Sequence, residues 1–274
     1  MVQHRRLNGL KLAFRNLKYN VYRRKPPTLP APLHGPVLIV GSAPIANKPV
    51  GFDDRFSVIT INGSQIVTKK WGIAVPDVTF IQSRQFDGMN MNALEVRRVL
   101  KGERTRMLYA LLWREGLAKL NERLQSFDYQ CDRVHIVNRY ERLALTRNLV
   151  GSCANEMDAE TKVSNGIIAV LFAIHNQATA IIISGINPDS RGHVYNDANL
   201  VRLHAKLDRE ILVDLQEKGY PLYTADPEVA KSIGLPLWDE QALGTYNSRY
   251  PLHHPNQSSG TRFLSGKSAG GSGL

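Results

Sequence analysis

Two side chains suited to acid–base chemistry, Tyr195 and His204, follow an apolar strand pattern over 179–184. In a doubly wound α/β protein, ligands bind in the loops that follow the carboxyl ends of the strands. An imidazole placed there can remove a proton from a hydroxyl group, and a phenol can donate a hydrogen bond to a departing phosphate. We therefore predict that His204 and Tyr195 face each other across one cleft, with Asp208 one helical turn on to orient the imidazole. A purely structural histidine is the alternative.

Polar residues also precede an apolar helix pattern over 165–176. Ser164 can cap this helix, and the free amides at a helix start attract an anion such as a carboxylate. A cap alone explains Ser164, whereas Lys162 adds a positive charge that a cap does not need. We predict that Lys162, Ser164 and Asn165 together bind an anion.

A glycine-containing turn follows the first strand pattern, over 37–41. A glycine at the end of a strand lets the backbone turn sharply and leaves amides free to face a phosphate or a ribose. The turn matches neither the dinucleotide-binding nor the Walker pattern, and a simple connection to the next helix is the alternative. The candidate ligand-binding residues here are Gly41, Ser42, Ala43 and Pro44.

Amide side chains close the next two predicted strands, where Asn62 ends one and Gln82 ends the other. A neutral amide offers donors and an acceptor that suit a base, a ribose hydroxyl or a sugar hydroxyl. Capping of the following turn is the alternative for each. The loop after 179–184 adds further candidates for ligand contact, which are Gly185, Asn187, Asp189, Arg191 and His193.

The sequence has no spacing typical of a metal site. It contains no HxxxH, no CxxC and no DxD-like acidic pair after a strand. Asp53 and Asp54 lie in a polar turn and are interpreted as solvated, while His135 and His175 lie in apolar runs and are interpreted as core residues. We predict neither a metal nor a cofactor.

Apolar runs alternate with helical patterns along most of the chain. We predict a short helix that starts at Pro227 with Asp226 as its N-cap. This alternation indicates an α/β fold, with a single Rossmann-like, doubly wound, mostly parallel sheet covered by helices on both faces. The predicted strands cover 37–41, 57–63, 78–82, 133–137, 179–184 and 221–225, and helical patterns cover parts of 91–125, then 165–176, 199–218 and 226–233.

The charge of the chain is concentrated at its start. The formal net charge is +11, and residues 1–25 hold eight Lys and Arg with no acidic residue. The rest carries 27 basic against 24 acidic side chains, so we predict no nucleic-acid-binding surface on the body. We divide the chain into a basic amphipathic helix (1–25), a proline-rich linker (26–36), a catalytic α/β domain (37–246) and a flexible tail (247–274).

The first segment places its apolar residues on one helical stripe and its basic residues around it. Such a helix can lie in an anionic membrane surface, and each nearby Lys or Arg contributes about 1 kcal/mol. A solvated arm or a helix docked on the body is the alternative. No signal peptide or spanning segment is evident, and Cys131 and Cys153 are interpreted as free thiols. We therefore expect a cytoplasmic protein that is peripheral on the inner membrane.

Taken in their order along the chain, these motifs resemble those of the bacterial sialyltransferases of glycosyltransferase family 42, over about residues 37–235. The family has a G-x-G-P-S turn where this chain has Gly41 to Pro44, and nucleotide- and donor-binding asparagines where it has Asn62 and Gln82. Its R-I-T-S-G and S-G-I-D motifs correspond to Lys162-Val163-Ser164-Asn165-Gly166 and Ser184-Gly185-Ile186-Asn187. Its second phosphate-binding tyrosine corresponds to Tyr195 and its catalytic histidine to His204, whereas Asp189 stands where the first tyrosine would be.

The resemblance implies a GT-A-like variant of the Rossmann fold and a metal-independent, inverting glycosyltransferase that uses a CMP-sugar donor. It implies transfer of sialic acid or a Kdo-like 2-keto sugar acid to a glycan or lipid-linked saccharide, such as a lipopolysaccharide precursor. His204 would be the general base, Tyr195 would stabilise the phosphate and Lys162 would supply charge. A pyrophosphokinase-like nucleotide enzyme and a non-catalytic membrane scaffold are the alternatives, and homo-oligomer formation is left open.

Overall fold

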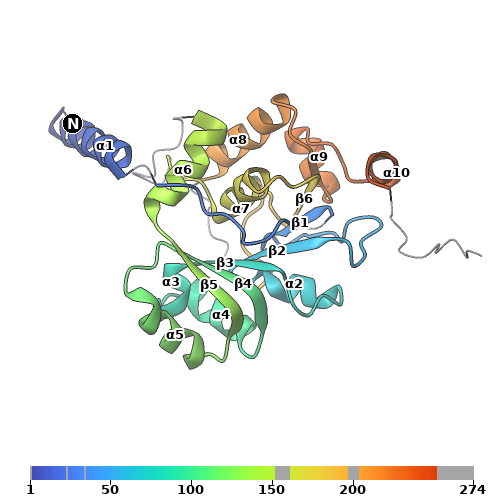
Figure 1. Cartoon of the computed structure of the whole chain (residues 1–274), viewed down its shortest axis with the longest axis horizontal. Coiled ribbons are helices and arrows are strands. Elements are labelled where there is room, and N and C mark those ends of the chain that lie inside the picture. The colour runs from blue at the N-terminus through green and yellow to red at the C-terminus, as the bar shows by residue number, and fades with distance from the viewer. Residues whose placement is uncertain (1, 23, 34, 152–160, 197–203, 252–274) are drawn as a thin grey trace, which may run out of the picture.

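A parallel sheet with helices on both faces makes up the body of the protein (Figure 1). The computed structural model describes residues 2–22, 24–33, 35–151, 161–196 and 204–251. The strands are β1 (Val37–Val40), β2 (Ser57–Ile61), β3 (Val78–Gln82), β4 (Arg104–Leu111), β5 (Gln130–Val137), β6 (Ile181–Ser184) and β7 (Leu222–Thr224). The helices are α1 (Val2–Tyr22), η1 (Asn62–Ser64), α2 (Gln65–Lys70), α3 (Ser83–Asp87), α4 (Met91–Leu100), α5 (Gly116–Ser126), α6 (Arg139–Val150), α7 (Asn165–His175), α8 (Ala205–Glu217), α9 (Pro227–Ile233) and α10 (Glu240–Arg249).

The sheet order is β5-β4-β3-β2-β1-β6-β7, and each neighbouring pair is parallel. The chain runs outward from β1 to β5 on one side and continues on the other side with β6 and β7. The order therefore reverses between β1 and β6, which is where a doubly wound sheet opens a crevice at its carboxyl edge. The predicted doubly wound α/β fold is confirmed.

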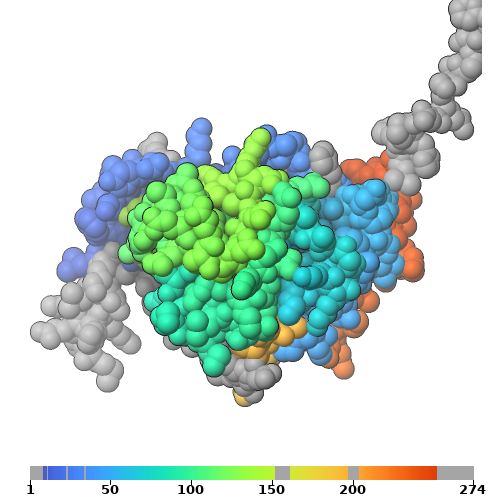
Figure 2. Space-filling model, turned by 90° about the horizontal axis from the view of Figure 1, so that it is seen from below, coloured from blue at the N-terminus to red at the C-terminus, as the bar shows by residue number. Residues whose placement is uncertain are grey.

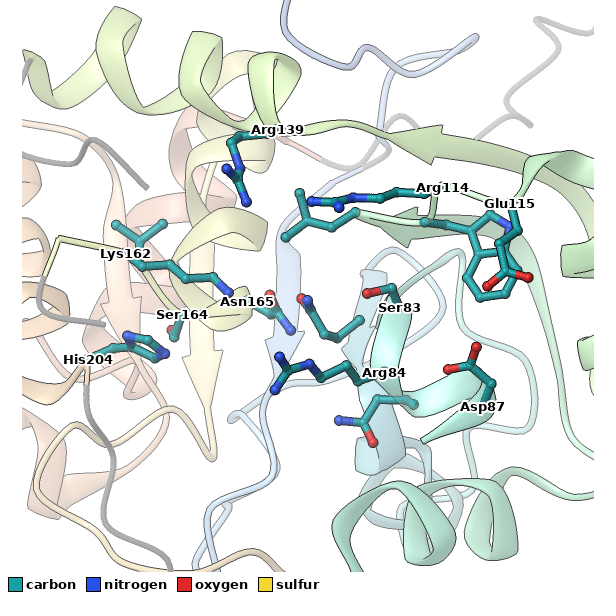
Figure 3. A pocket seen from close by; sticks show the side chains of 15 residues that line it. Ser83, Arg84, Asp87, Arg114, Glu115, Arg139, Lys162, Ser164, Asn165 and His204 are labelled. Carbon is teal, nitrogen blue, oxygen red and sulfur yellow. The ribbon is translucent and has the colours of Figure 1, made fainter. Parts of the chain in front are cut away.

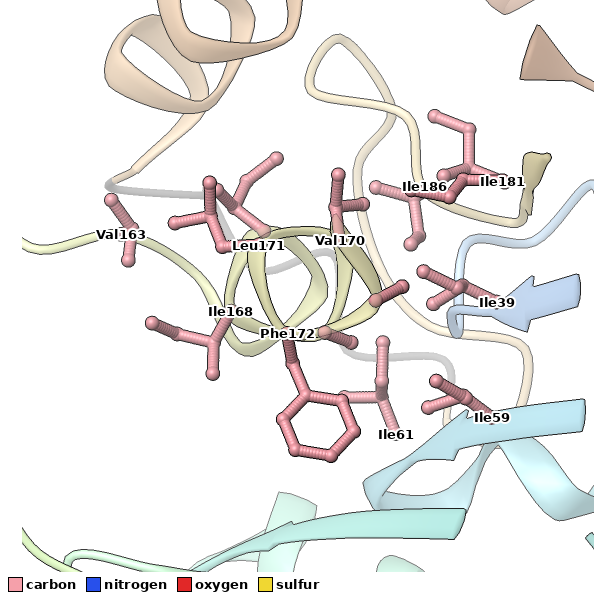
Figure 4. Packing of buried hydrophobic residues seen from close by; sticks show 14 of the residues in the cluster. Ile39, Ile59, Ile61, Val163, Ile168, Val170, Leu171, Phe172, Ile181 and Ile186 are labelled. Carbon is pink, nitrogen blue, oxygen red and sulfur yellow. The ribbon is translucent and has the colours of Figure 1, made fainter. Parts of the chain in front are cut away.

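The strands β1, β2, β3 and β6 are buried almost throughout, which explains why they are largely apolar runs. In β1, Val37 and Ile39 belong to the cluster that contains α7, while Leu38 and Val40 belong to the cluster on the opposite face. The helix α7 is apolar on nearly all sides and packs across β1, β2 and β3, with Phe172 among its fully buried side chains (Figure 4). This central position fixes where the first turn of α7 meets the carboxyl edge.

One strand contradicts the sequence prediction. The sequence predicts helices over parts of 91–125, one of them starting with LYALLW at residue 108, but residues 104–111 form β4 between α4 and α5. Its LYAL segment is rich in residues that favour helices, yet β4 pairs with β3 and β5 on both sides and is buried over its last four residues. Pairing on both edges outweighs the local preference here. The Lys101-Gly102 turn, with Gly102 at φ 77°, ends α4 before this strand.

The N-terminal helix α1 lies at the side of the body (Figures 1 and 2). Its last turns contact α6, where the Arg147 guanidinium lies over the Tyr19 ring at 4.3 Å and Tyr22 packs near Tyr140 at 5.9 Å. A stripe of apolar side chains on α1 is 62–72% exposed, and we call it the α1 stripe: Leu10, Phe14, Leu17 and Val21. Within the described part of the chain, every helix is too short or too polar to cross a bilayer.

Candidate functional site

A cavity of about 610 Å³ opens at the carboxyl edge of the sheet, above β3 and β4. Its walls come from the start of α3, the β4–α5 turn, the start of α6, the segment that leads into α7, and His204 before α8 (Figure 3). Five predicted site residues line this cavity, which are Gln82, Lys162, Ser164, Asn165 and His204. Residues far apart in sequence, such as Gln82 and His204, therefore meet at one cavity.

The start of α7 is built as the sequence predicts. Ser164 caps the helix, because its Oγ accepts a hydrogen bond from the Ile167 amide at 3.2 Å. The amide of Ser164 itself donates to Asp208 Oδ1 at 3.0 Å, and Asp208 is 7% exposed on α8. This contact ties α8 to the start of α7, and the predicted orientation of the His204 imidazole by Asp208 stays a prediction. His204 lies directly before α8 and faces the cavity near Ser164 (Figure 3).

A buried arginine that was not predicted from the sequence contacts the segment that leads into α7 from the side of α6. Arg142 on α6 is completely buried, and its guanidinium donates to Asn165 Oδ1 and to the Val163 carbonyl, each at 3.0 Å. A guanidinium has only donors, so the side-chain oxygen of Asn165 faces Arg142 and its NH₂ group is the part left for other contacts. The Asn138-Glu141 capping box that starts α6 gave a sequence signal for the helix but none for this contact.

Three arginines that the sequence analysis also missed line the same cavity. They are Arg84 on α3, Arg114 in the β4–α5 turn and Arg139, the first residue of α6. The cavity also borders two carboxylates, Asp87 and Glu115. Cationic side chains therefore outnumber anionic ones around this space, which favours an anionic ligand.

The turn after β1 is bonded to the end of β6. The Gly41 amide donates to the Ser184 carbonyl at 2.7 Å, and the Ala43 amide donates to the Gly185 carbonyl at 2.8 Å. These two amides are therefore used within the protein rather than free for a phosphate. A side chain at Gly41 would place its Cβ 2.3 Å from the Gly185 carbonyl oxygen, so glycine is required here for the close approach of β1 and β6. Ala43 is buried and Pro44 is exposed.

The loop after β6 is held by a buried carboxylate. Asp226 accepts hydrogen bonds from the Gly185 amide at 2.7 Å and from the amide and side chain of Asn47, each at 2.9 Å. Asp226 is the N-cap residue of α9 and Pro227 its first residue, as predicted, but the Asp226 side chain makes no cap hydrogen bond. Burial raises the pKa of Asp226 above its ordinary value, although the bonds from Gly185 and Asn47 oppose that shift.

Tyr195 does not line the cavity that His204 lines. Its ring is 5% exposed, belongs to an apolar cluster, and would contact any side chain placed at Gly63. It stacks on His193 at 5.1 Å, and His193 Nδ1 lies 2.8 Å from Ser42 Oγ. The expectation that His204 and Tyr195 face each other across one cleft is therefore wrong in this structure, because the phenol ring packs into the core beside η1. Its catalytic role stays a prediction.

The remaining predicted residues are not among those that line the cavity, and each makes contacts within the protein. Asn62, at φ 51°, accepts from the Gln82 amide at 3.0 Å and so joins the ends of β2 and β3. Asn187 closes a turn by accepting from the Asp189 amide at 2.9 Å. Asp189 pairs with Arg209, and that hydrogen bond holds the pKa of Asp189 below its ordinary value. Their predicted contacts with a nucleotide remain predictions.

Other predicted features fall partly outside the described residues. Cys153 and the start of the predicted helix over 199–218 lie there, and the described part of that helix is α8. Cys131 is a free thiol whose pKa is raised by burial and by Asp132. In the described part of the chain, no group of three or more His, Cys, Asp or Glu side chains is arranged to hold a metal ion.

Solved structures of sialyltransferases resemble this one. The α-2,3-sialyltransferase Cst-I from Campylobacter jejuni matches with a TM-score of 0.52 and 15% identity, over 79% of this chain and 85% of that one. The chain shares the fold of this enzyme. Two matches to CstII from the same organism, in complex with the substrate analogue CMP-3FNeuAc and with a trisaccharide acceptor and CMP, have TM-scores of 0.48 and 0.46 and identities of 18% and 17%. They cover 75% and 74% of this chain and 86% of each CstII chain.

No protein-family model and no curated protein matches the sequence. The predicted resemblance is confirmed at the level of the fold, by the match to Cst-I.

Proposed function

We propose that this protein is a metal-independent, inverting glycosyltransferase that moves a 2-keto sugar acid, sialic acid or a Kdo-like sugar, from a CMP-sugar to an acceptor hydroxyl. One observation carries the proposal: His204 borders the same cavity as the capped start of α7, with Lys162 beside it. A base and an anion-binding helix start are the two parts that this reaction needs from the protein.

The donor would bind with its carboxylate at the start of α7. There Lys162 supplies positive charge and the NH₂ group of Asn165 supplies hydrogen-bond donors. The nucleotide would extend toward the turn after β1 and toward Asn62, which lies next to Gln82 through the bond between Asn62 Oδ1 and the Gln82 amide. These contacts would hold the anomeric carbon in the cavity in front of His204.

In the reaction, His204 would remove the proton from the acceptor hydroxyl as the oxygen attacks the anomeric carbon. The new carbon–oxygen bond forms on one face while the bond to the phosphate oxygen breaks on the other, so CMP leaves with the electron pair and the configuration inverts. Lys162 would stabilise the charge that develops on the phosphate. For Tyr195 to donate to that phosphate, its ring would have to leave the apolar cluster that now contains it.

The function is tested by nucleotide-dependent thermal stabilisation. CMP at about 100 times its Kd should raise the Tm by about 5 °C or more, because such saturation adds about 2.7 kcal/mol to the stability of the folded state. AMP and UMP at the same concentration serve as controls and should stabilise less. CMP release from CMP-sialic acid should persist in EDTA. If CMP gives no shift, the enzyme proposal fails and a non-catalytic scaffold is favoured.

We also propose that α1 binds an anionic lipid surface and so brings the enzyme to a lipid-linked acceptor at the inner face of a bacterial membrane. The α1 stripe is exposed although it is apolar, and residues 1–25 carry eight basic side chains without an acidic one. Apolar contact with the acyl chains and attraction to anionic headgroups would act together.

Replacing Phe14 and Leu17 by serine should weaken binding to phosphatidylglycerol vesicles by at least about tenfold, because a buried Phe or Leu side chain contributes about 1.5–3 kcal/mol. Co-sedimentation of the full chain measures this. Leu117→Ser is the matched control, since Leu117 is 52% exposed on α5 and away from α1. Equal sedimentation of the double variant and the control would refute membrane binding through α1.

A further inference from the structure

Each of three neighbouring strands is followed, within three residues of its carboxyl end, by an arginine that lines the cavity. Arg84 follows β3, Arg114 follows β4 and Arg139 follows β5, and these strands are adjacent in the sheet. We call these three side chains the arginine face. Because parallel strands end at the same edge, the three guanidinium groups reach one space from three different supports.

No carboxylate in the described chain neutralises the arginine face. None of its members forms a salt bridge among the described residues, although Asp87 and Glu115 border the same cavity. Figure 3 shows why: the guanidinium groups of Arg84 and Arg114 point toward the start of α7, whereas Asp87 and Glu115 lie at the opposite end. Cations that converge in this way repel each other unless an anion binds between them.

Hydrogen bonds hold two of the supports of the arginine face in place. Arg97 donates to the Gln85 and Gly88 carbonyls at 2.9 and 2.8 Å, which fixes α3 and therefore Arg84. Before Arg114, the Trp113 indole donates to the Gly116 carbonyl at 2.8 Å, and Leu112 adopts φ 61°, which a residue other than glycine rarely does.

Arg139 also occupies a position that helix stability does not favour. It is the first residue of α6, directly after the Asn138 cap. The partial positive charge at a helix start disfavours a cation there. Helix stability therefore does not explain why an arginine stands here, whereas binding of an anionic ligand would explain it.

We propose, on the basis of the function above, that the arginine face binds a phosphate monoester on the acceptor, so that the acceptor is a phosphorylated saccharide. The donor carboxylate is assigned to the start of α7, so the arginine face across the cavity is left for the second substrate. Three guanidinium groups from three directions suit the three non-bridging oxygens of a phosphate. A planar carboxylate is satisfied by a single bidentate arginine.

The test uses binding to the full chain saturated with CMP, with glucose 6-phosphate, glucuronic acid and glucose as probes in calorimetry. We expect glucose 6-phosphate to bind at least about tenfold more tightly than the other two, since hydrogen bonds to charged groups are the stronger ones. Arg84→Gln, Arg114→Gln and Arg139→Gln should each weaken glucose 6-phosphate about tenfold and leave CMP affinity within about twofold. Arg249→Gln, at an exposed arginine that ends α10, is the matched control and should change neither.

Three results would overturn this inference but leave the proposed use of a CMP-sugar donor unaffected. They are equal affinity for glucuronic acid and glucose 6-phosphate, unchanged affinity in the three variants, and glucose 6-phosphate binding to the CMP-free chain that is lost when CMP saturates it, which would assign the arginine face to the donor. Glucose 6-phosphate binding by a chain that does not bind CMP would instead reject the proposed function, and with it an acceptor role for the arginine face. Melting temperatures close to that of Arg249→Gln show that a loss of binding is not a loss of fold.

Discussion

Replacement of His204 by alanine is expected to lower turnover by about 10²- to 10⁴-fold while CMP affinity stays within about twofold. The imidazole borders the cavity beside Lys162 and Ser164, so its loss removes the base that deprotonates the acceptor hydroxyl. The nucleotide contacts proposed near the turn after β1 and at Asn62 come from other elements, and Asn62 is not among the residues that line this cavity. CMP release from CMP-sialic acid measures turnover, and calorimetry measures CMP binding.

His175→Ala is the matched control for this experiment. His175 is the last residue of α7, at the opposite end of the helix from the Ser164 cap, and it does not line the cavity. Its replacement should leave turnover within about twofold, because proton transfer needs the base within hydrogen-bond reach of the acceptor. Turnover by His204→Ala that equals that of His175→Ala would remove His204 from the mechanism. Partial recovery on addition of free imidazole would support its role as the base.

The sequence was sufficient for the fold class because strands such as β1 and β6 are continuous apolar runs that alternate with helices. Both ends of α7 were predicted, since Ser164 is a strong cap and the helix is apolar all round. The strand over 104–111 was missed because its Leu and Ala residues favour a helix and only its pairing with β3 and β5 makes it a strand. The intrinsic helix or strand preference of a segment determines its structure only where tertiary contacts do not outweigh it.

The same error hid part of the site. Without a strand over 104–111, Arg114 had no place at the carboxyl edge, although Arg84 and Arg139 follow predicted strands and gave a usable signal. Tyr195 shows what the sequence could not reveal. The residue lies in the loop after β6, as predicted, but its distance from the strand along the sequence does not tell whether the ring faces a cavity or the core. The packing of Tyr195 against Gly63 depends on η1, which is far away in the sequence.

Arg142 is the residue whose role could be recognised only in three dimensions, and it leads to a second large expected effect. Its guanidinium holds the oxygen of Asn165, so the amide NH₂ group is the part available to a ligand carboxylate. Asn165→Asp keeps the size of the side chain but puts a second oxygen where the NH₂ group was. The new carboxylate would pair with Arg142, which is completely buried, and would stand in the first turn of α7, where the helix dipole favours an anion.

Stability and binding should therefore change in opposite directions in Asn165→Asp. The Tm should stay the same or rise, while affinity for a non-hydrolysable CMP-sialic acid analogue should fall by about 100-fold, because placing like charges together costs several kcal/mol. CMP alone lacks the sugar carboxylate, so its affinity should fall much less. Asn165→Ala, which removes the donors without adding charge, should give an intermediate loss. Equal losses for CMP and for the analogue would show that Asn165 does not face the sugar carboxylate, and a lower Tm would show that Arg142 does not accept the new charge.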